Sequence, residues 1–581
     1  MREIQHRNVE RPGFALRRRL LLGLFMCGML MLAGRAIFLQ IYDKQFLQQQ
    51  GDRRHISVVT VPAYRGKILD RNNVVLAIST PVESVWVNPQ HFKRNDAGNI
   101  DREALEKLQQ IAKWLKVPKK KMARWLSAET TKRFAYLKRR VNPQLVEKVR
   151  KLQVSGVYFE RAFKRYYPAG AVSAHIVGFT NVDDVGQEGM ELGYEQSLKG
   201  VAGKKRVIRD GRRRVISFKD VENIEDPVPG QDLVLSIDQR LQYIAHKELQ
   251  KTVVEHKALS ASLVILDAKN GDILAAVNQP AFNPNTRIGL TASVYRNRAI
   301  LDVFEPGSTV KPFVVAAALD GGYVEDAEKI KTQGYFRVGR NLVRDVHNYG
   351  TLSLMQVLKK SSNVAISKIA LKMPREYFWG IYNKLGFGLT AQVGFPGEAS
   401  GELLDFQRWH DFEQATLAYG YGLSTSVLQL ARSYTALADE GVLHSVSILK
   451  REEDYDAQRV FSRETAKQVT EMLEHVIKKD GTAYAARVDG YRVAGKTGTV
   501  KIAVAGGYAD DRYLAIFVGL APASNPRFVI AVMVNEPTAG KYYGGQVAAP
   551  VFSKVMAGAL RVYGVAPDKE DTMPVLITRI K

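Results

Sequence analysis

Two side chains that lie three residues apart could carry out acyl transfer. Ser308 and Lys311 occur in the stretch Phe304–Phe313, and a helix there would place both side chains on one face. A serine hydroxyl is a poor nucleophile until a base takes its proton, and a partly desolvated lysine can be that base. The spacing therefore predicts Ser308 as the nucleophile of an acyl-enzyme and Lys311 as its proton acceptor.

The spacing alone is weak evidence, because it recurs in the chain. Ser447 and Lys450 have the same separation, but they lie in a run that favours extended structure and has no helix start. Such a pair is more often a capped helix with a solvated lysine than a catalytic centre. The interpretation of Ser308 therefore depends on partners elsewhere in the chain.

The residues around Ser308 indicate how it is positioned. Pro306 and Gly307 favour a turn, and the apolar run that follows ends at Asp320-Gly321-Gly322. Pro312 is tolerated only near a helix start, so we expect the helix to begin at about Ser308. That start would place the hydroxyl at the positive end of the helix dipole, with backbone N–H groups free to face a developing anion.

A second motif, Ser361-Ser362-Asn363, opens a predicted helical run. The Ser361 hydroxyl can relay a proton, and the Asn363 amide can hold a lysine or a substrate carbonyl. Taken alone, the tripeptide is more often a simple helix N-cap.

A third motif, Lys496-Thr497-Gly498-Thr499, is predicted to lie on a strand. Gly498 would let a substrate backbone approach closely. Lys496 and the two threonine hydroxyls could bind a carboxylate. The chain order of the three motifs, and the helix or strand on which each lies, make the set more specific than any one of them.

The elements around the motifs predict an α+β fold. Strands are expected at 261–267 and 272–277, joined across Asn270-Gly271, and at 491–500, 513–520 and 528–535. We expect a helix from about Asp238, another over 549–563, and a largely helical block over 308–475. Strands from both ends with helices between them predict one antiparallel sheet flanked by helices.

Length and composition limit the number of domains and the kinds of partner that the chain can have. Its 581 residues predict several domains, and its net charge of +25 suggests nucleic acid, a membrane surface or a cell-wall polymer nearby. No zinc spacing or nucleic-acid motif supports a metal or a nucleic-acid partner. Cys27 is the only cysteine, which excludes an intramolecular disulfide.

The N-terminus has the pattern of a membrane anchor. Residues 1–19 contain six arginines: Arg2, Arg7, Arg11, Arg17, Arg18 and Arg19. The apolar segment Leu20–Tyr42 is long enough to span a bilayer if Arg35 snorkels to an interface. A cleaved signal peptide is the alternative, and Gly34-Arg35-Ala36 is a poor cleavage site for it. The arginines predict a cytoplasmic N-terminus, with the rest of the chain outside.

Residues 43–230 are mixed and basic. We expect an extended opening at 56–62, a hairpin-like passage at 64–73 and a helical basic patch from Leu105 to about Leu152. None of these has catalytic spacing, which indicates a spacer or docking module.

With these motifs in place, the chain resembles the class B penicillin-binding proteins, and most closely the division-specific peptidoglycan D,D-transpeptidases of the penicillin-binding protein 3 type. The likeness covers nearly the whole chain and includes four further passages: Arg65–Asn72, Arg165–Gly170, Tyr419–Gly422 and Lys541–Gly545. Asn73 replaces a glycine that is common in the family, and Ser362 replaces an aspartate of the lactamase tripeptide. Neither departure removes a catalytic group.

The resemblance implies acyl transfer between peptidoglycan stem peptides. Ser308 would attack the carbonyl between the two terminal D-alanines, Lys311 would take its proton, and Ser361 would help to protonate the departing D-alanine. An amine of a second stem peptide would resolve the acyl-enzyme, and β-lactams would block Ser308. The substrate-holding residues that the resemblance implies are Asn363, Lys496, Thr497, Gly498 and Thr499, and the implied oxyanion hole is formed by the backbone N–H groups of Ser308 and Thr499. It implies no metal and no cofactor.

The resemblance also divides the chain and locates it. The expected parts are a cytoplasmic tail (1–19), a transmembrane anchor (20–42), a pedestal of the dimerisation type (43–230), a transpeptidase domain (231–565) and a C-terminal tail (566–581). The catalytic domain would be periplasmic on the inner membrane, and the implied partners are divisome proteins that include a membrane glycosyltransferase, without nucleic acid. Alternatives left open are an elongation-type transpeptidase, a membrane-tethered D,D-carboxypeptidase or β-lactamase, and a non-catalytic β-lactam sensor or scaffold.

Overall fold

The computed structural model describes residues 14–92, 102–127, 131–209, 215–217, 223–286, 291–452, 456–504 and 506–569. Contacts within the chain define two compact units. One runs to Ala63 and includes Val201–Val228, and the other comprises Tyr64–Gly200 and the chain from Pro229 onward. The predicted tail residues Arg2, Arg7 and Arg11, and residues 570–581 of the predicted C-terminal tail, lie outside the described residues.

The first unit contains the predicted anchor. Helix α1 (Phe14–Ile37) continues into the π-helical turn η1 (Phe38–Tyr42), and together they are long and apolar enough to cross a membrane. The helix extends N-terminally beyond the predicted Leu20, so Arg17–Arg19 lie in its first turns. The remaining elements are α2 (Lys44–His55) and a small antiparallel sheet of β1 (Ile56–Val61), β8 (Gly203–Arg209), β9 (Val215–Ser217) and β10 (Asn223–Glu225).

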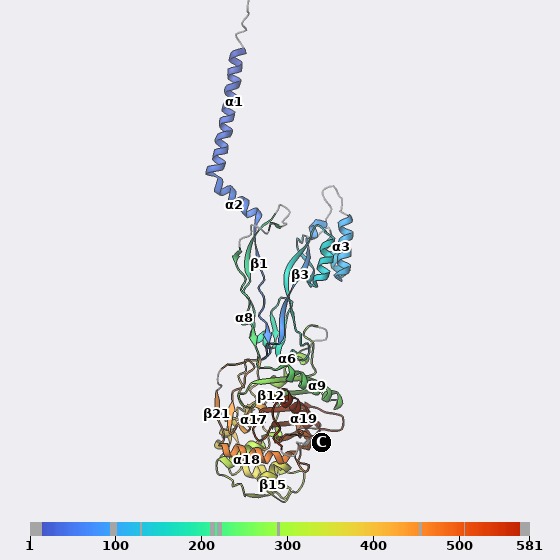
Figure 1. Cartoon of the computed structure of the whole chain (residues 1–581), viewed down its shortest axis with the longest axis vertical. Helices are drawn as coiled ribbons and strands as arrows, with labels where there is room; N and C mark the ends of the chain where they lie inside the picture. Colours follow the sequence, from blue (N-terminus) through green and yellow to red (C-terminus); the bar gives the residue numbers. More distant parts are fainter. Residues whose placement is uncertain are drawn as a thin grey trace, which may run out of the picture. The chain divides into compact units, whose positions relative to one another are not determined.

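The second unit begins with a lobe built on a twisted sheet (Figure 1). Its strands, in the order β11-β2-β3-β4 with β5 paired to β3, are β11 (Leu233–Val234), β2 (Ile68–Leu69), β3 (Val75–Val87), β4 (Ala135–Val141) and β5 (Val157–Tyr166). The pairing of β2 with β3 confirms the predicted hairpin-like passage. Helices α3 (Arg102–Trp114), α4 (Lys119–Leu126) and α5 (Pro143–Lys151) share an apolar core with the sheet.

The predicted helical patch from Leu105 to Leu152 is wrong in its middle. Residues 135–141 form strand β4 between α4 and α5. Ala135 and Leu137 alternate with more exposed neighbours and lie on the buried face. This period of two is typical of a half-buried strand and outweighs the basic composition that suggested a helix.

Short elements link this lobe to the catalytic domain: α6 (Ala174–Val177), β6 (Phe179–Thr180), β7 (Gly186–Glu188), α7 (Gly189–Gly193) and α8 (Glu195–Leu198).

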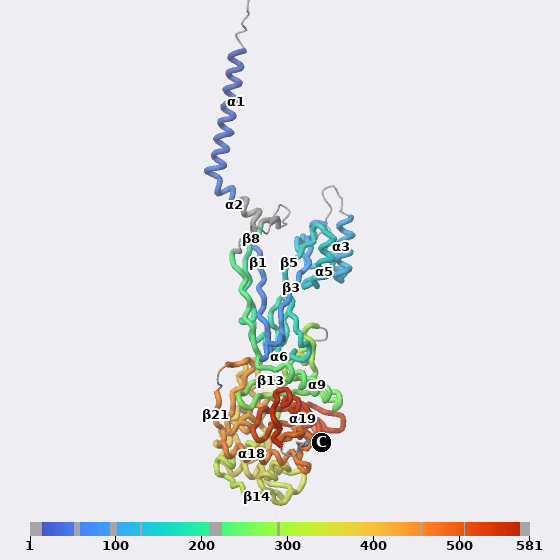
Figure 2. Tube along the Cα trace, viewed as in Figure 1, coloured from blue at the N-terminus to red at the C-terminus, as the bar shows by residue number. Residues whose placement is uncertain are grey.

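The domain that carries the three motifs is organised around a five-stranded antiparallel sheet, which confirms the predicted α+β class. Its order is β13 (Ile273–Gln279), β12 (Ser260–Asp267), β24 (Phe528–Asn535), β23 (Gly507–Ala521) and β22 (Ala494–Val504). Helices α9 (Gln239–Glu255) and α19 (Gly544–Val562) pack on each other and on the sheet, while α17 (Val427–Ala438) contacts it from the helical block. Figure 2 shows the two ends of the domain, green and red, side by side.

Some boundaries differ from the prediction. Strand β22 begins at Ala494 and β23 at Gly507, and they form one long hairpin whose far end is polar. Apolar alternation does not mark that end, because backbone pairing and polar side-chain contacts such as Lys501–Asp510 hold it. Helix α19 begins at Gly544, so Pro550 lies inside the helix, where it leaves a carbonyl one turn earlier without its intrahelical donor.

The nucleophile region is helical from Gly307, within one residue of the prediction. A 3-10 turn, η3 (Gly307–Val310), leads directly into α12 (Lys311–Asp320), and residues 311–318 are all buried. Four helices surround α12: α13 (Leu354–Lys360), α14 (Asn363–Ala370), α15 (Arg375–Lys384) and α18 (Arg463–Glu474). Short two-stranded sheets complete the block, among them β14 (Lys329–Lys331) with β17 (Thr351–Ser353) and β15 (Tyr335–Val338) with β16 (Asn341–Arg344).

Candidate active site

Ser308 lies on the tight turn that precedes α12, and it is partly exposed. The neighbouring Gly307 has a φ of +55°, and a Cβ there would approach Val500 Cγ2 to 2.4 Å. Its backbone N–H donates to the carbonyl of Gly420 at 3.1 Å. Only glycine fits this backbone position, so the turn sequence itself places Ser308 beside strand β22.

Lys311 is completely buried one helical turn after Ser308. Its Nζ donates to the backbone carbonyl of Ser361 at 2.6 Å, to Ser361 Oγ at 3.2 Å and to Asn363 Oδ1 at 2.8 Å. Burial and the nearby Lys496 lower the pKa of Lys311 well below its ordinary value, and Asp345 opposes that change. A lysine in this environment is readily neutral and can accept a proton.

Lys496, on β22, approaches the same serine from the other side. It is also completely buried, and its Nζ donates to Ser361 Oγ at 2.8 Å and to the carbonyl of Thr497 at 3.3 Å. Burial lowers the pKa of Lys496 to about 7. The Ser361 hydroxyl therefore lies between two buried amines, an arrangement that can pass protons between them.

Ser361 is held in an unusual backbone conformation. It caps α13 with a φ of +58°, in the left-handed region, which costs a non-glycine residue about 1 kcal/mol. The next residue, Ser362, begins α14 by accepting a hydrogen bond from the N–H of Ala365 at 3.0 Å. The predicted N-cap is thus present at Ser362, while the strained turn before it directs the Ser361 hydroxyl to the lysines.

The strand motif packs closely on the nucleophile turn. A Cβ at Gly498 would lie 3.0 Å from Thr309 Cγ2 and 3.2 Å from the carbonyl oxygen of Pro306. Thr499 Oγ1 accepts a hydrogen bond from the N–H of Gly544 at 3.0 Å, which leaves the hydroxyl hydrogen available to donate. The motif therefore presents a lysine and a hydroxyl donor at the edge of the sheet next to Ser308.

Thr497 is anchored from a different segment. Its Oγ1 lies 3.0 Å from Thr482 Oγ1, so the two hydroxyls are hydrogen-bonded. Thr482 belongs to no motif that the sequence singled out, whereas Gly544 lies in the passage Lys541–Gly545. Only the fold reveals that the two residues support the threonines.

Comparison with known proteins accounts for both lobes. Residues 261–557 match the family described as the penicillin binding protein transpeptidase domain, and residues 60–235 match the penicillin-binding protein dimerisation domain. The probable peptidoglycan D,D-transpeptidase PenA of Neisseria meningitidis (strain MC58) is 41% identical over 94% of this chain and 93% of its own. The chain belongs to the class B penicillin-binding proteins of the PBP3 type.

Two other members of the family are similar over much of the chain. The peptidoglycan D,D-transpeptidase FtsI of Escherichia coli (strain K12) is 40% identical over 98% of this chain and 94% of its own. The solved transpeptidase domain of penicillin-binding protein 3 from Burkholderia pseudomallei is 43% identical, with a TM-score of 0.54. The matched region covers 58% of this chain and 98% of the Burkholderia pseudomallei domain.

The competing pair at Ser447 and Lys450 does not form a site of this kind. Ser447 Oγ donates to the carbonyl of Leu449 at 2.9 Å, and Lys450 Nζ donates to the carbonyl of Arg71 at 3.2 Å. Both groups are engaged with nearby backbone and not with each other. In this penicillin-binding protein only the pair in the transpeptidase motif has the expected helical context.

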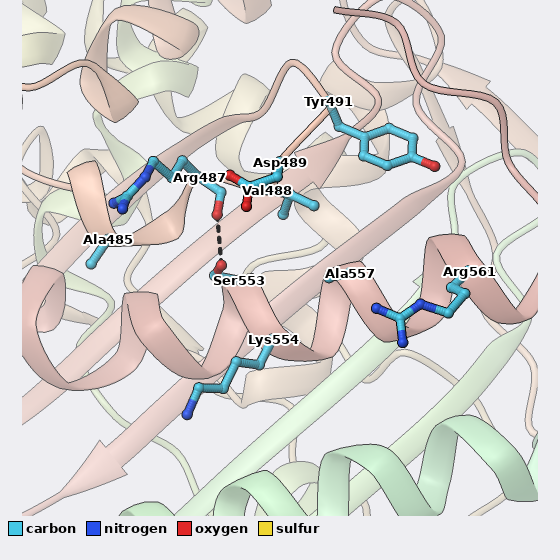
Figure 3. Close-up of a pocket in the computed structure, with 9 residues that line it drawn as sticks. All are labelled: Ala485, Arg487, Val488, Asp489, Tyr491, Ser553, Lys554, Ala557 and Arg561. Carbon is cyan, nitrogen blue, oxygen red and sulfur yellow. Dashed lines mark hydrogen bonds between the residues drawn. The ribbon is translucent and has the colours of Figure 1, made fainter. Parts of the chain in front are cut away.

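A separate cavity of about 540 Å³ lies between α19 and the segment around Arg487 (Figure 3). Ser553 Oγ donates to the carbonyl of Arg487 at 2.6 Å across it. The cationic side chains around it point in different directions in Figure 3, and none of its lining residues is a predicted site residue. The hydrogen-bond network around Ser361, and not this cavity, locates the candidate active site.

One further carboxylate in the site was missed by the sequence analysis. Asp345 follows β16 and accepts hydrogen bonds from Ser362 Oγ at 2.6 Å and from the backbone N–H of Asn363 at 2.5 Å. It lies at no fixed spacing from a motif, so the sequence carries no signal for it. Among the described residues, no group of three His, Cys, Asp or Glu side chains is arranged to hold a metal ion.

Proposed function

We propose that the chain is a septal peptidoglycan D,D-transpeptidase that works through a Ser308 acyl-enzyme. The observation that carries this proposal is the Ser361 hydroxyl held between buried Lys311 and Lys496. It occurs beside Ser308 in a chain whose relatives, at about 40% identity over most of its length, are named D,D-transpeptidases.

Acylation follows from the protonation of the two lysines. Ser308 Oγ attacks the carbonyl carbon between the terminal D-alanines while its proton moves to the neutral amine of Lys311. The C–N bond of the tetrahedral intermediate then breaks, and the departing D-alanine nitrogen takes a proton from the Ser361 hydroxyl, which the lysines replenish. The products are an ester on Ser308 and free D-alanine.

Substrate is held by the strand motif and by Asn363. Lys496, with the Thr497 and Thr499 hydroxyls, binds the terminal carboxylate of the donor, and Gly498 leaves room for its backbone. The backbone N–H groups of Ser308 and Thr499 face the developing oxyanion, each worth roughly 3–4 kcal/mol in the transition state. An acceptor amine then attacks the ester and gives its proton to Lys311. The C–O bond to Ser308 breaks as Lys311 returns that proton to Ser308 Oγ, which leaves free serine and a new cross-link.

The acceptor that we propose is an amine and not water, because Glu305 and Glu413 are each held by hydrogen bonds through one carboxylate oxygen. The other oxygen of Glu305, Oε2, is buried and has no hydrogen-bond partner among the described residues. Glu305 Oε1 accepts hydrogen bonds from the N–H of Gly422 at 2.8 Å and from Tyr508 Oη at 3.1 Å. Glu413 Oε2 accepts from the N–H of His410 at 3.1 Å and caps a helix. These engagements favour a transpeptidase over a β-lactamase, and the same slow hydrolysis makes β-lactams inhibitors.

Mass spectrometry after a penicillin chase tests this function. We expect a stoichiometric adduct on Ser308, released slowly by water and converted to cross-linked product when an amine acceptor is supplied. Ser308→Ala should abolish the adduct, whereas Ser447→Ala should retain it. Hydrolysis at many turnovers per second would favour the β-lactamase alternative, and an unlabelled protein would favour a silent scaffold.

We further propose the division of the chain into tail (1–19), anchor (20–42), pedestal (43–230), transpeptidase domain (231–565) and C-terminal tail (566–581). The described arginines at the start of α1 support an N-terminus in the cytoplasm and a catalytic domain in the periplasm. Divisome proteins, including a membrane glycosyltransferase, are the proposed partners at the septum.

The proposed topology has a direct test. A reporter that is active only in the periplasm, fused at the C-terminus, should be active. A reporter that is active only in the cytoplasm should stay silent at the same position, and activity there would reverse the orientation.

A further inference from the structure

The sheet of the pedestal lobe has aromatic side chains on the face opposite its helices. Trp86 of β3 lies opposite Tyr136 of β4 and Tyr158 of β5 in the strand register. The neighbouring Val85 and Leu137 point into the core that the sheet shares with α3, α4 and α5, and Figure 2 shows α3 and α5 on the same side of β3. Because side chains alternate along a strand, the three rings lie on the other face.

These rings form one continuous aromatic patch, which we define as Trp86, Phe134, Tyr136 and Tyr158. Trp86 stacks on Tyr158 with 4.3 Å between ring centroids, and the ring of Phe134 lies 4.8 Å from those of Trp86 and Tyr136. The Tyr136 hydroxyl donates to Glu160 Oε2 at 2.6 Å, which holds that ring in place. Phe134 is 47% exposed. An exposed group of fixed rings is typical of a binding surface.

Positive charge adjoins the aromatic patch. Lys132 and Arg133 directly precede Phe134, and both are exposed. Among the described residues, no carboxylate pairs with either of them. Arg139 lies over the Tyr136 ring, with its Cζ 5.2 Å from the ring centroid. A ligand on this face therefore meets both ring surface and uncompensated positive charge, which suits a molecule that has apolar faces and negative groups.

We propose that the aromatic patch, with Lys132 and Arg133 at its edge, binds a glycan strand of peptidoglycan at a place separate from Ser308. This inference rests on the proposed function, in which that strand carries the stem peptides to be cross-linked. The C–H faces of a hexose ring pack on aromatic side chains, because the face of an aromatic ring carries negative charge density. The carboxylates that end the stem peptides are attracted by the two cations.

A second contact with the same polymer has a consequence for cross-linking. The pedestal lobe and the transpeptidase domain belong to one compact unit of the chain. A strand held by the lobe therefore stays close to the enzyme after one stem peptide has left Ser308. The next stem peptide is then captured at a raised effective concentration, without any new contact at the active site.

The experiment measures binding of the full-length chain in detergent, with excess penicillin present to occupy the Ser308 site. One probe is a soluble, uncross-linked glycan strand that carries its stem peptides. A second is a neutral β-1,4-linked oligomer of N-acetylglucosamine, which offers sugar rings without carboxylates. A third is polyglutamate, which offers carboxylates without sugar and so reports a surface for an acidic protein.

Two variants separate ring contact from charge. Phe134→Ala removes the exposed ring, and the double variant Lys132→Glu with Arg133→Glu reverses the charge. Matched controls lie on α9 of the transpeptidase domain: Tyr243→Ala, which removes a 55% exposed ring, and Lys247→Glu, which reverses an exposed charge.

We expect Phe134→Ala to weaken binding of both sugar probes by about tenfold, the scale of one lost stacking contact. The charge reversal should weaken binding of the stem-bearing strand by about tenfold at low salt, and less at high salt, because exposed charges are screened. It should leave the neutral oligomer unaffected, and both controls should bind as wild type does. If Phe134→Ala does not fold, Phe134→Leu, which keeps an apolar side chain without a ring, replaces it.

Three results would overturn the proposal: no binding of the strand by the wild-type chain, equal losses in the α9 controls, or tight binding of polyglutamate without binding of the neutral oligomer. Fluorescent penicillin labelling of each variant is followed in parallel and should equal that of wild type. An unlabelled wild-type chain would reject the proposed function, whereas the binding comparison needs no acylation, so the two failures are distinguishable.

Discussion

Two clusters of buried charged side chains in the second unit differ in whether a group of opposite charge compensates each charge. In the pedestal lobe, Glu191 is completely buried and contacts Arg65 and Arg165, each at 2.6 Å, while Arg65 also contacts Glu195 at 2.7 Å. In the catalytic domain, Lys311 and Lys496 are equally buried, but both surround the neutral Ser361 hydroxyl. The first cluster pairs opposite charges, and the second brings like charges together.

The difference distinguishes a cluster that supports the fold from a cluster that can exchange protons. The ion pairs of the pedestal cluster join the passages Arg65–Asn72 and Arg165–Gly170 to Glu191. Unpaired lysines lose their protons more easily when they are buried, so the catalytic cluster can take and return a proton near neutral pH. The same fold therefore uses burial to stabilise one cluster and to make the other reactive.

The largest effect should come from changing the proton acceptor. Lys311→Arg keeps a positive charge but cannot lose its proton at accessible pH, so acylation by penicillin should fall on the order of a thousandfold, the scale of a lost general base. The rate of fluorescent penicillin labelling measures it. Lys496→Arg is the matched control, and we expect it to retain partial acylation. Equal losses in both variants would contradict the different roles assigned to the two lysines.

The next effect should appear in stability and not in chemistry. Glu191→Gln leaves two buried arginines without their central carboxylate, which should lower the free energy of unfolding by about 3–5 kcal/mol. Denaturant unfolding of the full-length chain measures this change. The folded fraction should still acylate within about twofold of wild type, because the catalytic cluster is untouched. Unchanged stability would mean that the pedestal cluster is not the structural support proposed for it.

The smallest effect should be a change of pH profile. Because burial lowers the pKa of Lys496 to about 7, the cation proposed to hold the substrate carboxylate is lost as pH rises through that value. Acylation should therefore decline on the alkaline side with an apparent pKa near 7, by about tenfold in all up to pH 10, because the neutral amine still donates a hydrogen bond. Lys496→Arg stays charged, so its profile should be flat there. A wild-type rate that is constant from pH 7 to pH 10 would show that Lys496 does not act through its charge.

The motifs were predictable because their information is local. A three-residue spacing, a proline confined to a helix start and paired glycines after an apolar run define the position of Ser308 through backbone geometry alone. The strand hairpin at 260–279 and the sheet of the catalytic domain follow in the same way from alternation and turn residues. These patterns already predicted the helix that carries Ser308 and the α+β class.

Contacts between distant segments were decided only by the tertiary structure. Ser361 meets Lys496 across 135 residues and Lys311 across 50, and Asp345 joins α14 from a strand that carries no motif. Such contacts depend on how α12, α14 and β22 pack, which no spacing in the sequence encodes. The pKa of Lys496 is decided there too, because complete burial, and not the identity of the residue, removes the water that would keep it charged.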